Sequence, residues 1–534
     1  MSFYAVAKGL VPGIYNDWLE AKAQVNGFPN AVFKLFKTLK EAEAFMDKEE
    51  EKKEAVEAVE AVVVEAVVAK TSKLNTLTHE QRAVFDYLLE GQSMALLGPA
   101  GVGKSYLLSI IYTELPELRP CMVQLCAMTG CAALLIGHKA KTLHSWAGIG
   151  LGKDDVDTLY MKICKNGRAK KNWRNTDVLV IDEISMATPD LLDKLNALGK
   201  KLRRSSKPFG GIQVLFVGDF YQLPPVNKVS HQAMFAFECD AWKETVTRIM
   251  ELTIIQRQKD PVFQQVLMEA RAGSFTAESI GILESCKREW QQNKIRPTLI
   301  FPRRMEVDQI NTANLVALQG EVHVYKAKIT LTKPPIDFKE KAEAFQSAVA
   351  ALDNDASYFV ELELRVGAQV MLCANIDSDM GLVNGSRGVI IRICPASHMP
   401  YVEFVNGVER MIGPHEWVID GYPFASRSQV PLRLSYAITI HRSQGSTLDC
   451  ALVDVGAGTF EYGQAYVALS RVTSLEALYI HSFDPGAFRV HPKVREFYKA
   501  LADHKALADH KALADHKALA DHKALADHKA LKAE

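Results

Sequence analysis

The residues whose types and spacing most directly indicate chemistry form a glycine-rich segment that ends in lysine and serine. It reads Gly98-Pro-Ala-Gly-Val-Gly-Lys-Ser105 and lies between an apolar run, Ser93 to Leu97, and a helical pattern, Tyr106 to Leu115. In this arrangement backbone N–H groups surround phosphates, the lysine neutralises their charge and the serine hydroxyl ligates magnesium. The sequence therefore predicts an ATP-phosphate site that consists of Gly98, Pro99, Ala100, Gly101, Val102, Gly103, Lys104 and Ser105.

Two further apolar runs end in polar residues suited to phosphoryl transfer. Val178 to Ile181 leads into Asp182-Glu183, and Val214 to Val217 is followed by Gln222. Parallel strands bring such ends to the sheet edge where open α/β folds bind ligands. We expect Asp182 to hold Mg²⁺ together with the serine, Glu183 to orient or deprotonate water, and Gln222 to sense the γ-phosphate. The alternative for Glu183 is a strand-end carboxylate without a catalytic role.

The elements that must position these residues alternate along the chain. From about Thr76 to Ala500, short Val, Ile and Leu runs alternate with helical patterns, as in parallel sheets covered by helices. The 534 residues exceed what one hydrophobic core usually serves. The pattern predicts two α/β units.

Composition narrows the class of protein. Lys plus Arg equals Asp plus Glu, 63 of each, so any nucleic-acid surface must be local. The nine cysteines form no C-x-x-C pair, and Cys121, Cys126 and Cys131 are too widely spaced for common zinc ligands. The longest apolar span, Val62 to Val68, is short and contains Glu65. We expect a soluble intracellular protein without a membrane partner, and leave a nuclear or viral replication compartment open.

Longer motifs around the polar residues resemble the superfamily-one helicases and, more narrowly, the RecD-related PIF family. They are Asp182-Glu-Ile-Ser185 and Gly218-Asp-Phe-Tyr-Gln-Leu-Pro-Pro225. The matching order continues through Thr142-Leu-His-Ser145, Val366-Gly-Ala-Gln-Val-Met371, Leu382-Val-Asn-Gly-Ser-Arg-Gly388, His441-Arg-Ser-Gln-Gly-Ser-Thr447 and Ala465-Tyr-Val-Ala-Leu-Ser-Arg471. The resemblance covers the region from residue 74 to residue 484.

The resemblance implies two RecA-like motor domains that use ATP and Mg²⁺ to travel 5′→3′ on single-stranded DNA and to unwind duplex DNA in replication, repair, recombination or telomere maintenance. We also expect the protein to unwind RNA–DNA hybrids. It makes Gln81 the adenine-binding residue, and Arg257 and Arg471 the arginine fingers. It also places four residues near the single-strand channel: Thr129, His144, His441 and Gln444. Pro302-Arg-Arg304 departs from the family pattern, so strand contacts by that segment stay open.

The first 46 residues form a separate pattern that resembles the hybrid-binding domain of ribonucleases H and caulimovirus viroplasmin. It includes Phe3-Tyr-Ala-Val6, Pro12-Gly-Ile-Tyr15, Trp18 and Phe33-Lys34. The resemblance implies that Tyr4, Trp18 and Phe33 contact the DNA strand of an RNA–DNA hybrid, with Lys34 adding charge and RNA 2′-hydroxyls supplying discrimination. The alternative is a protein-interaction module in which these aromatic residues form the core.

The predicted organisation is therefore a small α+β module followed by an α/β protein with two RecA-like P-loop motor domains and small insertions. The boundaries are 1–46 for the module, 47–73 for a Glu/Ala/Val-rich linker, 74–247 for the first motor domain with an insertion near 146–174, 248–498 for the second with a β-barrel-like insertion near 375–433, and 499–534 for a hexapeptide-repeat tail. Two alternatives stay open: an ATP-driven translocase that displaces proteins without unwinding, and a hybrid-binding scaffold with a dead ATPase. Protein partners are not indicated.

Overall fold

The computed structural model describes residues 2–8, 10–25, 31–47, 73–150, 152–225, 235–290, 296–336, 338–355, 358–377, 380–419, 422 and 424–504. Most of the predicted linker and of the repeat tail lies outside these residues. The described chain divides into an N-terminal unit and a much larger second unit, and each is described by itself. None of the described helices is long and apolar enough to cross a membrane.

The N-terminal unit contains an antiparallel sheet of order β2-β1-β3. Its elements are β1 (Phe3–Lys8), β2 (Gly13–Tyr15), α1 (Trp18–Val25), β3 (Val32–Phe36) and a helix over residues 39–47. Ala5, Val6, Ala21 and Ala42 are fully buried. Since these buried side chains are small, the core of this α+β module is thin.

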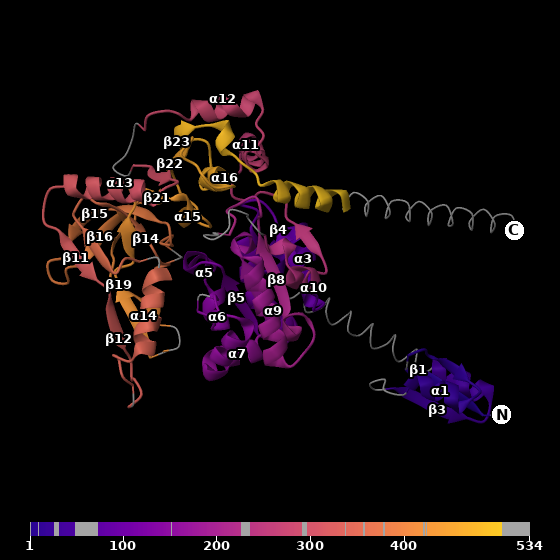
Figure 1. Cartoon of the computed structure of the whole chain (residues 1–534). Helices are drawn as coiled ribbons and strands as arrows, with labels where there is room; N and C mark the ends of the chain where they lie inside the picture. Colours follow the sequence, from indigo (N-terminus) through magenta and orange to yellow (C-terminus); the bar gives the residue numbers. More distant parts are fainter. Residues whose placement is uncertain are drawn as a thin grey trace. The chain divides into compact units, whose positions relative to one another are not determined.

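The region predicted as the first motor domain, which keeps that name below, is built on a parallel sheet of order β6-β5-β7-β8-β4-β9. Figure 1 labels β4, β5 and β8 of this sheet. The strands are β4 (Met94–Leu97), β5 (Val123–Ala127), β6 (Lys141–Thr142), β7 (Val178–Asp182), β8 (Gln213–Gly218) and β9 (Ile249–Glu251). Every residue of β4, β7 and β8 is buried. Burial on both faces explains why these strands read as continuous apolar runs in the sequence.

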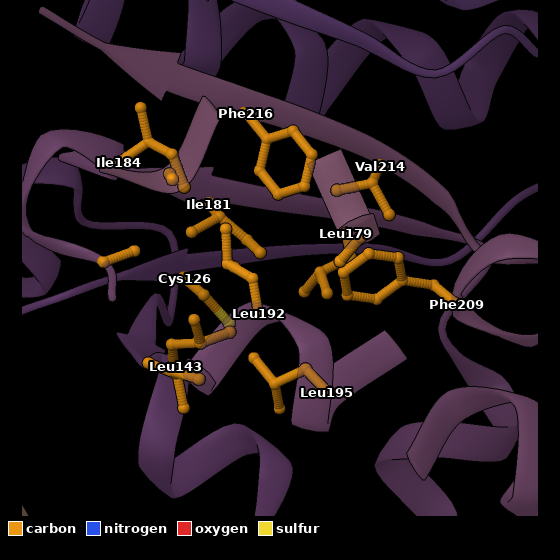
Figure 2. Close-up of a cluster of buried hydrophobic side chains, with 14 of the residues drawn as sticks. Cys126, Leu143, Leu179, Ile181, Ile184, Leu192, Leu195, Phe209, Val214 and Phe216 are labelled. Carbon is orange, nitrogen blue, oxygen red and sulfur yellow. The ribbon is translucent and has the colours of Figure 1, made fainter. Parts of the chain in front are cut away.

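Helices cover this sheet and contribute to one large core. They are α3 (His79–Leu89), α4 (Lys104–Leu118), α5 (Gly130–Ile136), α6 (Leu143–Ala147), α7 (Val156–Lys165), α8 (Gly167–Asn175), α9 (Pro189–Arg203) and α10 (Asp240–Thr245), with short 3₁₀ turns η2 (Ile184–Met186), η3 (Pro208–Gly211) and η4 (Ala236–Glu238). Figure 2 shows Leu192 and Leu195 of α9 beside Leu143, Ile181 and Phe209 in this core. The packing fixes the strands whose ends carry the candidate site.

The region predicted as the second motor domain, which also keeps its name below, has a smaller parallel sheet of order β21-β10-β22-β23. Its strands are β10 (Thr298–Phe301), β21 (Ala437–Thr439), β22 (Ala451–Val455) and β23 (Leu478–Phe483). Its helices are α11 (Pro261–Ala272), α12 (Ala277–Ser285), α13 (Arg304–Ala317), α15 (Ile440–Ser443) and α16 (Gln464–Leu469), followed by η5 (Pro485–Ala487). Two parallel sheets confirm the predicted α/β fold class.

Antiparallel strands are inserted between β10 and β21. They are β11 (His323–Lys326), β12 (Lys328–Leu331), β13 (Glu361–Leu364), β14 (Gln369–Leu372), β15 (Arg387–Ile393), β16 (Pro400–Phe404), β17 (Glu409–Met411), β18 (His415–Val418), β19 (Ala425–Gln429) and β20 (Leu432–Leu434), accompanied by α14 (Glu343–Asp355). The insertion starts at His323, before the predicted Asn375, because β11 pairs with β13 and β12 pairs with β19. Such pairing between distant segments has no local sequence signal.

Two motif residues anchor this insertion to the second motor sheet. Arg387 is 2% exposed at its side chain and forms a two-pronged ion pair with Asp449 at 2.7 and 2.6 Å. The Gln369 side-chain amide accepts from Arg296 N at 2.8 Å and donates to Arg296 O at 2.9 Å. Both family-like motifs, around residues 366–371 and 382–388, therefore contribute to the junction between the sheets.

The last described helix, over residues 492–504, packs on the first motor domain. Val494 and Tyr498 belong to the buried cluster around the first sheet. The Phe497 ring stacks on the Phe237 ring, with centroids 4.3 Å apart. The sequence predicted a domain boundary at 498 and 499 within this helix, and gave no indication that the chain returns to the first motor domain.

Candidate active site

The polar residues predicted at strand ends meet at one edge of the first sheet. β4 pairs with β8 and β7 pairs with β8, all in parallel. Their carboxyl ends lead directly into the glycine-rich loop, into Asp182-Glu183, and into the segment with Gln222. The loop, the carboxylates and the glutamine therefore face a common region, as phosphoryl transfer requires.

Gln81 supports the glycine-rich loop from α3. Thr78 and Gln81 form a capping box at the start of this helix, which fixes the Gln81 position. The Gln81 side chain is 3% exposed, and its Nε2 donates to Val102 O and Gly103 O, each at 3.4 Å. Gly103 has φ +83°, and a Cβ there would lie 2.7 Å from Gln81 Nε2. The positive φ therefore favours glycine at Gly103. The adenine contact of Gln81 stays a prediction.

Lys104, the first residue of α4, lies inside the loop. Its Nζ donates to Gly98 O at 2.6 Å and to Pro99 O at 2.8 Å. Burial lowers the pKa of Lys104, and the neighbouring carboxylates of Asp219 and Glu183 act in the opposite direction. The loop carbonyls thus hold a partly buried cation where phosphate charge would be neutralised.

Asp182 is buried, and the adjacent Glu183 is half-buried. Asp182 Oδ1 accepts from Glu183 N at 2.9 Å. Burial and the adjacent Glu183 charge raise the pKa of Asp182 to about 7, and burial also raises the pKa of Glu183. Glu183 has φ +56° and ψ +44°, a left-handed conformation that is strained for a side chain of this size. A cation near Asp182 would offset the unfavourable burial of the two charges.

The predicted boundary between residues 247 and 248 is too early, because β9 (Ile249–Glu251) pairs with β4 in the first sheet. Three residues that follow β9 in the chain contact this edge. Gln444 Nε2 donates to Glu183 Oε2 at 2.9 Å. Ala100 N, an amide of the glycine-rich loop, donates to Tyr466 Oη at 2.9 Å. Arg257 N donates to Gly101 O at 3.1 Å. Residues of both motor domains therefore build the site, so a movement between the domains would change its geometry.

The two predicted arginine fingers lie at this junction but are held by carbonyl oxygens. Arg257 Nη1 donates to Ser470 O at 3.0 Å. Arg471 is 1% exposed and donates to Val467 O at 2.7 Å and to Ser443 O at 3.2 Å. Burial lowers the pKa of both guanidinium groups, that of Arg471 to about 9. Neither guanidinium contacts the glycine-rich loop here, so the finger role stays a prediction.

Gln222 is 5% exposed and lies where the second motor domain presses on the first. Gly463 has φ +70°, and a Cβ there would lie 2.3 Å from Tyr221 O and 2.6 Å from Gln222 O. This close approach places α16 of the second motor domain directly against the Gln222 backbone. The position suits a residue that responds to closure of the two domains.

The four residues predicted near the single-strand channel separate into different environments. Thr129 caps α5 and accepts from Ala132 N at 3.2 Å, and His144 is half-buried in α6. Gln444 contacts Glu183, and so belongs to the candidate ATP site rather than to an open channel. His441 lines a pocket, and burial lowers its pKa. Of these four residues, His441 alone lines this pocket.

The pocket around His441 has a volume of about 470 Å³ and combines cations with aromatic rings. Its lining includes Arg303, Arg304, Arg433, Arg442, Phe359 and Phe460. The Arg442 guanidinium lies 5.7 Å from the Phe359 ring centroid, and Phe460 is 52% exposed. Arg303 and Arg304 come from the segment that departs from the family pattern. Cations beside exposed rings are the features that bind phosphates and stacked bases.

The aromatic residues predicted in the N-terminal unit form a row. The ring centroids of Tyr4 and Trp18 are 5.3 Å apart and those of Trp18 and Phe33 are 5.8 Å apart. Trp18 is 38% exposed and Phe33 is 45% exposed. Lys34 follows Phe33 in β3, so the two side chains point to opposite faces, and Lys34 Nζ lies 5.7 Å from the Phe36 centroid. The predicted charge therefore does not lie beside the aromatic row.

The sequence gave no indication of a buried polar cluster around Asp219, three residues before Gln222. Asp219 is fully buried, and Arg271 of α11 donates to it from Nη2 at 2.9 Å and from Nε at 3.1 Å. The Tyr498 hydroxyl donates to the same carboxylate at 3.2 Å, and the Arg271 guanidinium lies 4.4 Å from the Tyr221 ring centroid. Asp219, Arg271 and Tyr498 come from three distant segments, so no spacing could have indicated the cluster.

Comparisons with known proteins agree with this geometry. The family described as PIF1-like helicase matches residues 76–277, the DNA helicase Pif1 2B domain matches residues 357–393, and the Ribonuclease H1 N-terminal domain matches residues 2–46. The ATP-dependent DNA helicase PIF1 of Xenopus laevis is 38% identical over 429 residues, 80% of this chain. The match spans 64% of the length of that relative.

Solved structures give the same result. The crystal structure of Pif1 helicase from Candida albicans is 39% identical, with a TM-score of 0.67, and the match covers 80% of this chain and 99% of that one. The crystal structure of Pif1 helicase from Bacteroides in complex with ADP-AlF3 and ssDNA is 28% identical, with a TM-score of 0.57. That match covers 80% of this chain and 97% of the Bacteroides chain.

Proposed function

The chain belongs to the PIF1-like helicase family, and from that premise we propose that it is an ATP-dependent DNA helicase that travels 5′→3′ on single-stranded DNA. One observation carries the proposal: residues of both motor domains converge on the glycine-rich loop and Glu183. Gln444 and Tyr466 make these contacts from the second motor domain, and Arg257 makes its contact from the segment between β9 and α11. ATP hydrolysis at such a junction is coupled to movement of one domain against the other.

ATP and Mg²⁺ fit the residues at the sheet edge. Loop N–H groups and Lys104 suit the phosphates, and the Ser105 hydroxyl and Asp182 carboxylate are the oxygen ligands that Mg²⁺ takes beside phosphates. Burial raises the pKa of Asp182, and a bound cation would stabilise the ionised form of this carboxylate. When bound, Mg²⁺ would neutralise charge on the outer phosphates. Glu183 would orient the attacking water, and Arg257 and Arg471 would stabilise charge after domain closure.

The strand site proposed for the second motor domain is the pocket around His441. Arg303, Arg442 and His441 suit contacts to phosphates, and Phe460 offers an exposed ring for base stacking. These contacts do not depend on base identity, which stepping along any sequence requires. α15, which carries His441 and Arg442, ends one residue before Gln444. Strand contacts are therefore adjacent in the chain to the contact with Glu183.

Unwinding of fluorescent duplexes with a single-stranded 5′ tail or 3′ tail tests this proposal. We expect ATP-dependent opening of the 5′-tailed substrate alone, and no opening by Lys104→Ala, which loses the cation of the loop. Opening of only the 3′-tailed duplex would contradict the proposed polarity. If neither duplex opens while single strands stimulate ATP hydrolysis, the translocase alternative replaces the helicase. If the wild type hydrolyses no more ATP than Lys104→Ala, even with single strands present, the scaffold with a dead ATPase replaces both.

We propose in addition that the N-terminal unit binds RNA–DNA hybrids. The support is its match to the Ribonuclease H1 N-terminal domain together with the row of Tyr4, Trp18 and Phe33, of which Trp18 and Phe33 are exposed. Such rings pack on sugars and bases, and recognition of RNA 2′-hydroxyls distinguishes a hybrid from DNA. The module would direct the motor to structures that contain both strands, such as R-loops or primed templates.

A further inference from the structure

Two basic segments of the first motor domain are brought together on one side of its sheet. Of the ten residues from 165 to 174, five are Lys or Arg and none is Asp or Glu. Of the eight residues from 200 to 207, five are Lys or Arg and none is acidic. In a chain with no net charge, these runs are a strong local excess of positive charge. Their separation in sequence hides the fact that they form one surface.

Arg203 joins the two segments. Its Nη1 donates to Trp173 O at 3.0 Å, Arg174 O at 3.1 Å and Thr176 O at 3.0 Å, at the end of α8. Its Nε donates to Gly210 O at 3.0 Å, in the turn that follows α9. The guanidinium thus fixes the end of α8 against the end of α9. The neighbouring side chains of both segments point to solvent around this junction.

The resulting basic surface consists of Lys170, Lys171, Arg174, Arg204 and Lys207. Lys170 is half-buried and the other four residues are exposed. On α8, Ala169 and Trp173 face the core, so a rotation of about 100° per residue directs Lys171 and Arg174 away from it. None of the five residues forms an ion pair with a carboxylate in the part of the chain that the structure describes.

The acidic residues of this region are already engaged elsewhere. Asp154 pairs with Lys162 at 2.7 Å, Glu244 pairs with Lys200 at 2.5 Å, and Asp157 pairs with Lys201. Asp155 caps α7, and Asp177 accepts from Met122 N at 2.8 Å. These contacts neutralise other lysines or satisfy backbone groups. The basic surface therefore keeps its positive charge, which attracts anions.

The surface lies at the opposite edge of the sheet from the candidate ATP site. Thr176 and Asp177 precede β7, and Asp177 O accepts from Gln213 N, where β8 begins. Asp182 and Gly218 end the same two strands. Five residues at about 3.3 Å each separate the two edges by roughly 15 Å. A ligand on the basic surface therefore occupies a different place from ATP.

We propose that this basic surface docks the phosphate backbone of duplex nucleic acid. The side chains present are those that neutralise phosphates without base recognition. No aromatic side chain is exposed on α8 or from residue 200 to residue 211, since Trp173 and Phe209 are fully buried. Single strands are bound through stacking on exposed rings, which this surface does not offer. The inference rests on the proposed function only because it takes nucleic acid as the partner. A binding measurement tests it without any measurement of unwinding.

The test uses the full chain and a blunt, fluorescently labelled 20-base-pair duplex. Fluorescence anisotropy is measured from low to high KCl for Lys171→Glu/Arg174→Glu and, separately, for Arg204→Glu/Lys207→Glu. Each lost phosphate contact makes the slope of log affinity against log salt about 0.9 less steep, so each pair should flatten it by about 2 and weaken duplex binding tenfold or more. Affinity for oligo-dT, and ATP hydrolysis stimulated by oligo-dT, should stay within about twofold.

A matched control is Lys339→Glu/Lys341→Glu, which makes the same change in net charge at exposed residues before α14. An equal loss of duplex affinity in this control would overturn the proposal, because the effect would then be one of total charge. Unchanged duplex affinity in both surface variants would also overturn it. A third result would also overturn it: the wild type binds a labelled poly-glutamate peptide more tightly than duplex, and the surface variants lose this binding. The surface would then bind an acidic protein.

Acetylation of the wild-type protein gives a second measurement that needs no variant. Bound duplex should protect Lys171 and Lys207 from the reagent at least threefold, while Lys339 and Lys341 react as before. Oligo-dT should give no such protection. Equal reactivity of Lys171 and Lys207 with and without duplex would overturn the proposal even if the charge-reversed chains failed to fold. Absence of ATP hydrolysis in the wild type would contradict the proposed function. It would not affect the measurement of duplex binding at the basic surface.

Discussion

Glu183 is constrained more tightly than its position after a buried strand suggests. Its backbone is left-handed, its side chain is half-buried, and its Oε2 accepts from Gln444 Nε2 at 2.9 Å. The proposed role of Glu183 is to orient water, and a small rotation of the carboxylate would misplace that water. Gln444 therefore acts on hydrolysis as a positioning residue, through Glu183.

Gln444→Ala tests this contact at the scale of one side chain. We expect kcat for ATP hydrolysis to fall about tenfold, since a general base that is held less firmly loses part of a contribution of 10²–10⁴-fold. KM for ATP should change little, because Gln444 does not contact the glycine-rich loop. Steady-state kinetics with saturating oligo-dT measure both constants. Gln444→Glu keeps the size of the side chain but places a second carboxylate beside Glu183. Full activity in Gln444→Ala would show that the contact does not position the base.

The helix over residues 492–504 is an element whose position the predicted domain boundaries do not explain. It buries Val494 and Tyr498 in the core of the first motor domain, and its Tyr498 hydroxyl reaches Asp219 and Phe220 N. Asp219 in turn binds Arg271 of α11. The helix thus joins the end of the chain to the segment that carries Gln222.

Truncation after residue 490 should therefore destabilise the first motor domain, whereas truncation after residue 504 should not. Loss of two buried side chains costs about 3–6 kcal/mol at 1.5–3 kcal/mol each, before the exposure of Phe220 and Phe237 is counted. Both truncated chains lack most of the repeat tail, so the difference between their free energies of unfolding comes from the helix. Thermal unfolding followed by circular dichroism should show a Tm lower by about 10 °C or more for the shorter chain. Equal Tm values would show that the helix is dispensable for the domain.

At the scale of the whole molecule, the N-terminal unit and the motor are separate units, each with its own core. Separate cores allow one unit to be removed while the other stays folded. The two proposed functions are assigned to different units: hybrid binding to the first unit and ATP-driven unwinding to the second.

Removal of residues 1–46 should leave unwinding of 5′-tailed DNA within about twofold and weaken binding to an RNA–DNA hybrid about tenfold or more. The expected loss corresponds to one or two ring contacts at roughly 1–3 kcal/mol each. Fluorescence anisotropy with hybrid and DNA duplexes of one sequence measures it. In the full chain, Trp18→Ala should reproduce the loss, while Leu19→Ala, at a residue 73% exposed on the same helix, should not. If the truncated chain binds the hybrid as tightly as the full chain, the proposed role of the N-terminal unit in binding hybrids is wrong.

The sequence by itself determined the α/β class and the residues at the carboxyl ends of β4, β7 and β8. Buried parallel strands appear as continuous apolar runs, and the residue after each run must lie at the ligand-binding edge. Local patterns of this kind need no knowledge of the rest of the chain, which is why Lys104, Asp182 and Glu183 could be placed together in advance.

Only the tertiary structure decided which distant residues complete the site and which stay apart from it. Gln444 was expected in a strand channel and lies on Glu183, Lys34 was expected beside Phe33 and points to the other face, and Tyr498 reaches Asp219 across most of the chain. The basic surface likewise depends on Arg203, which joins two segments with no sequence relation. Periodicity and spacing report neighbours along one element, whereas contacts between elements follow from how their buried faces pack.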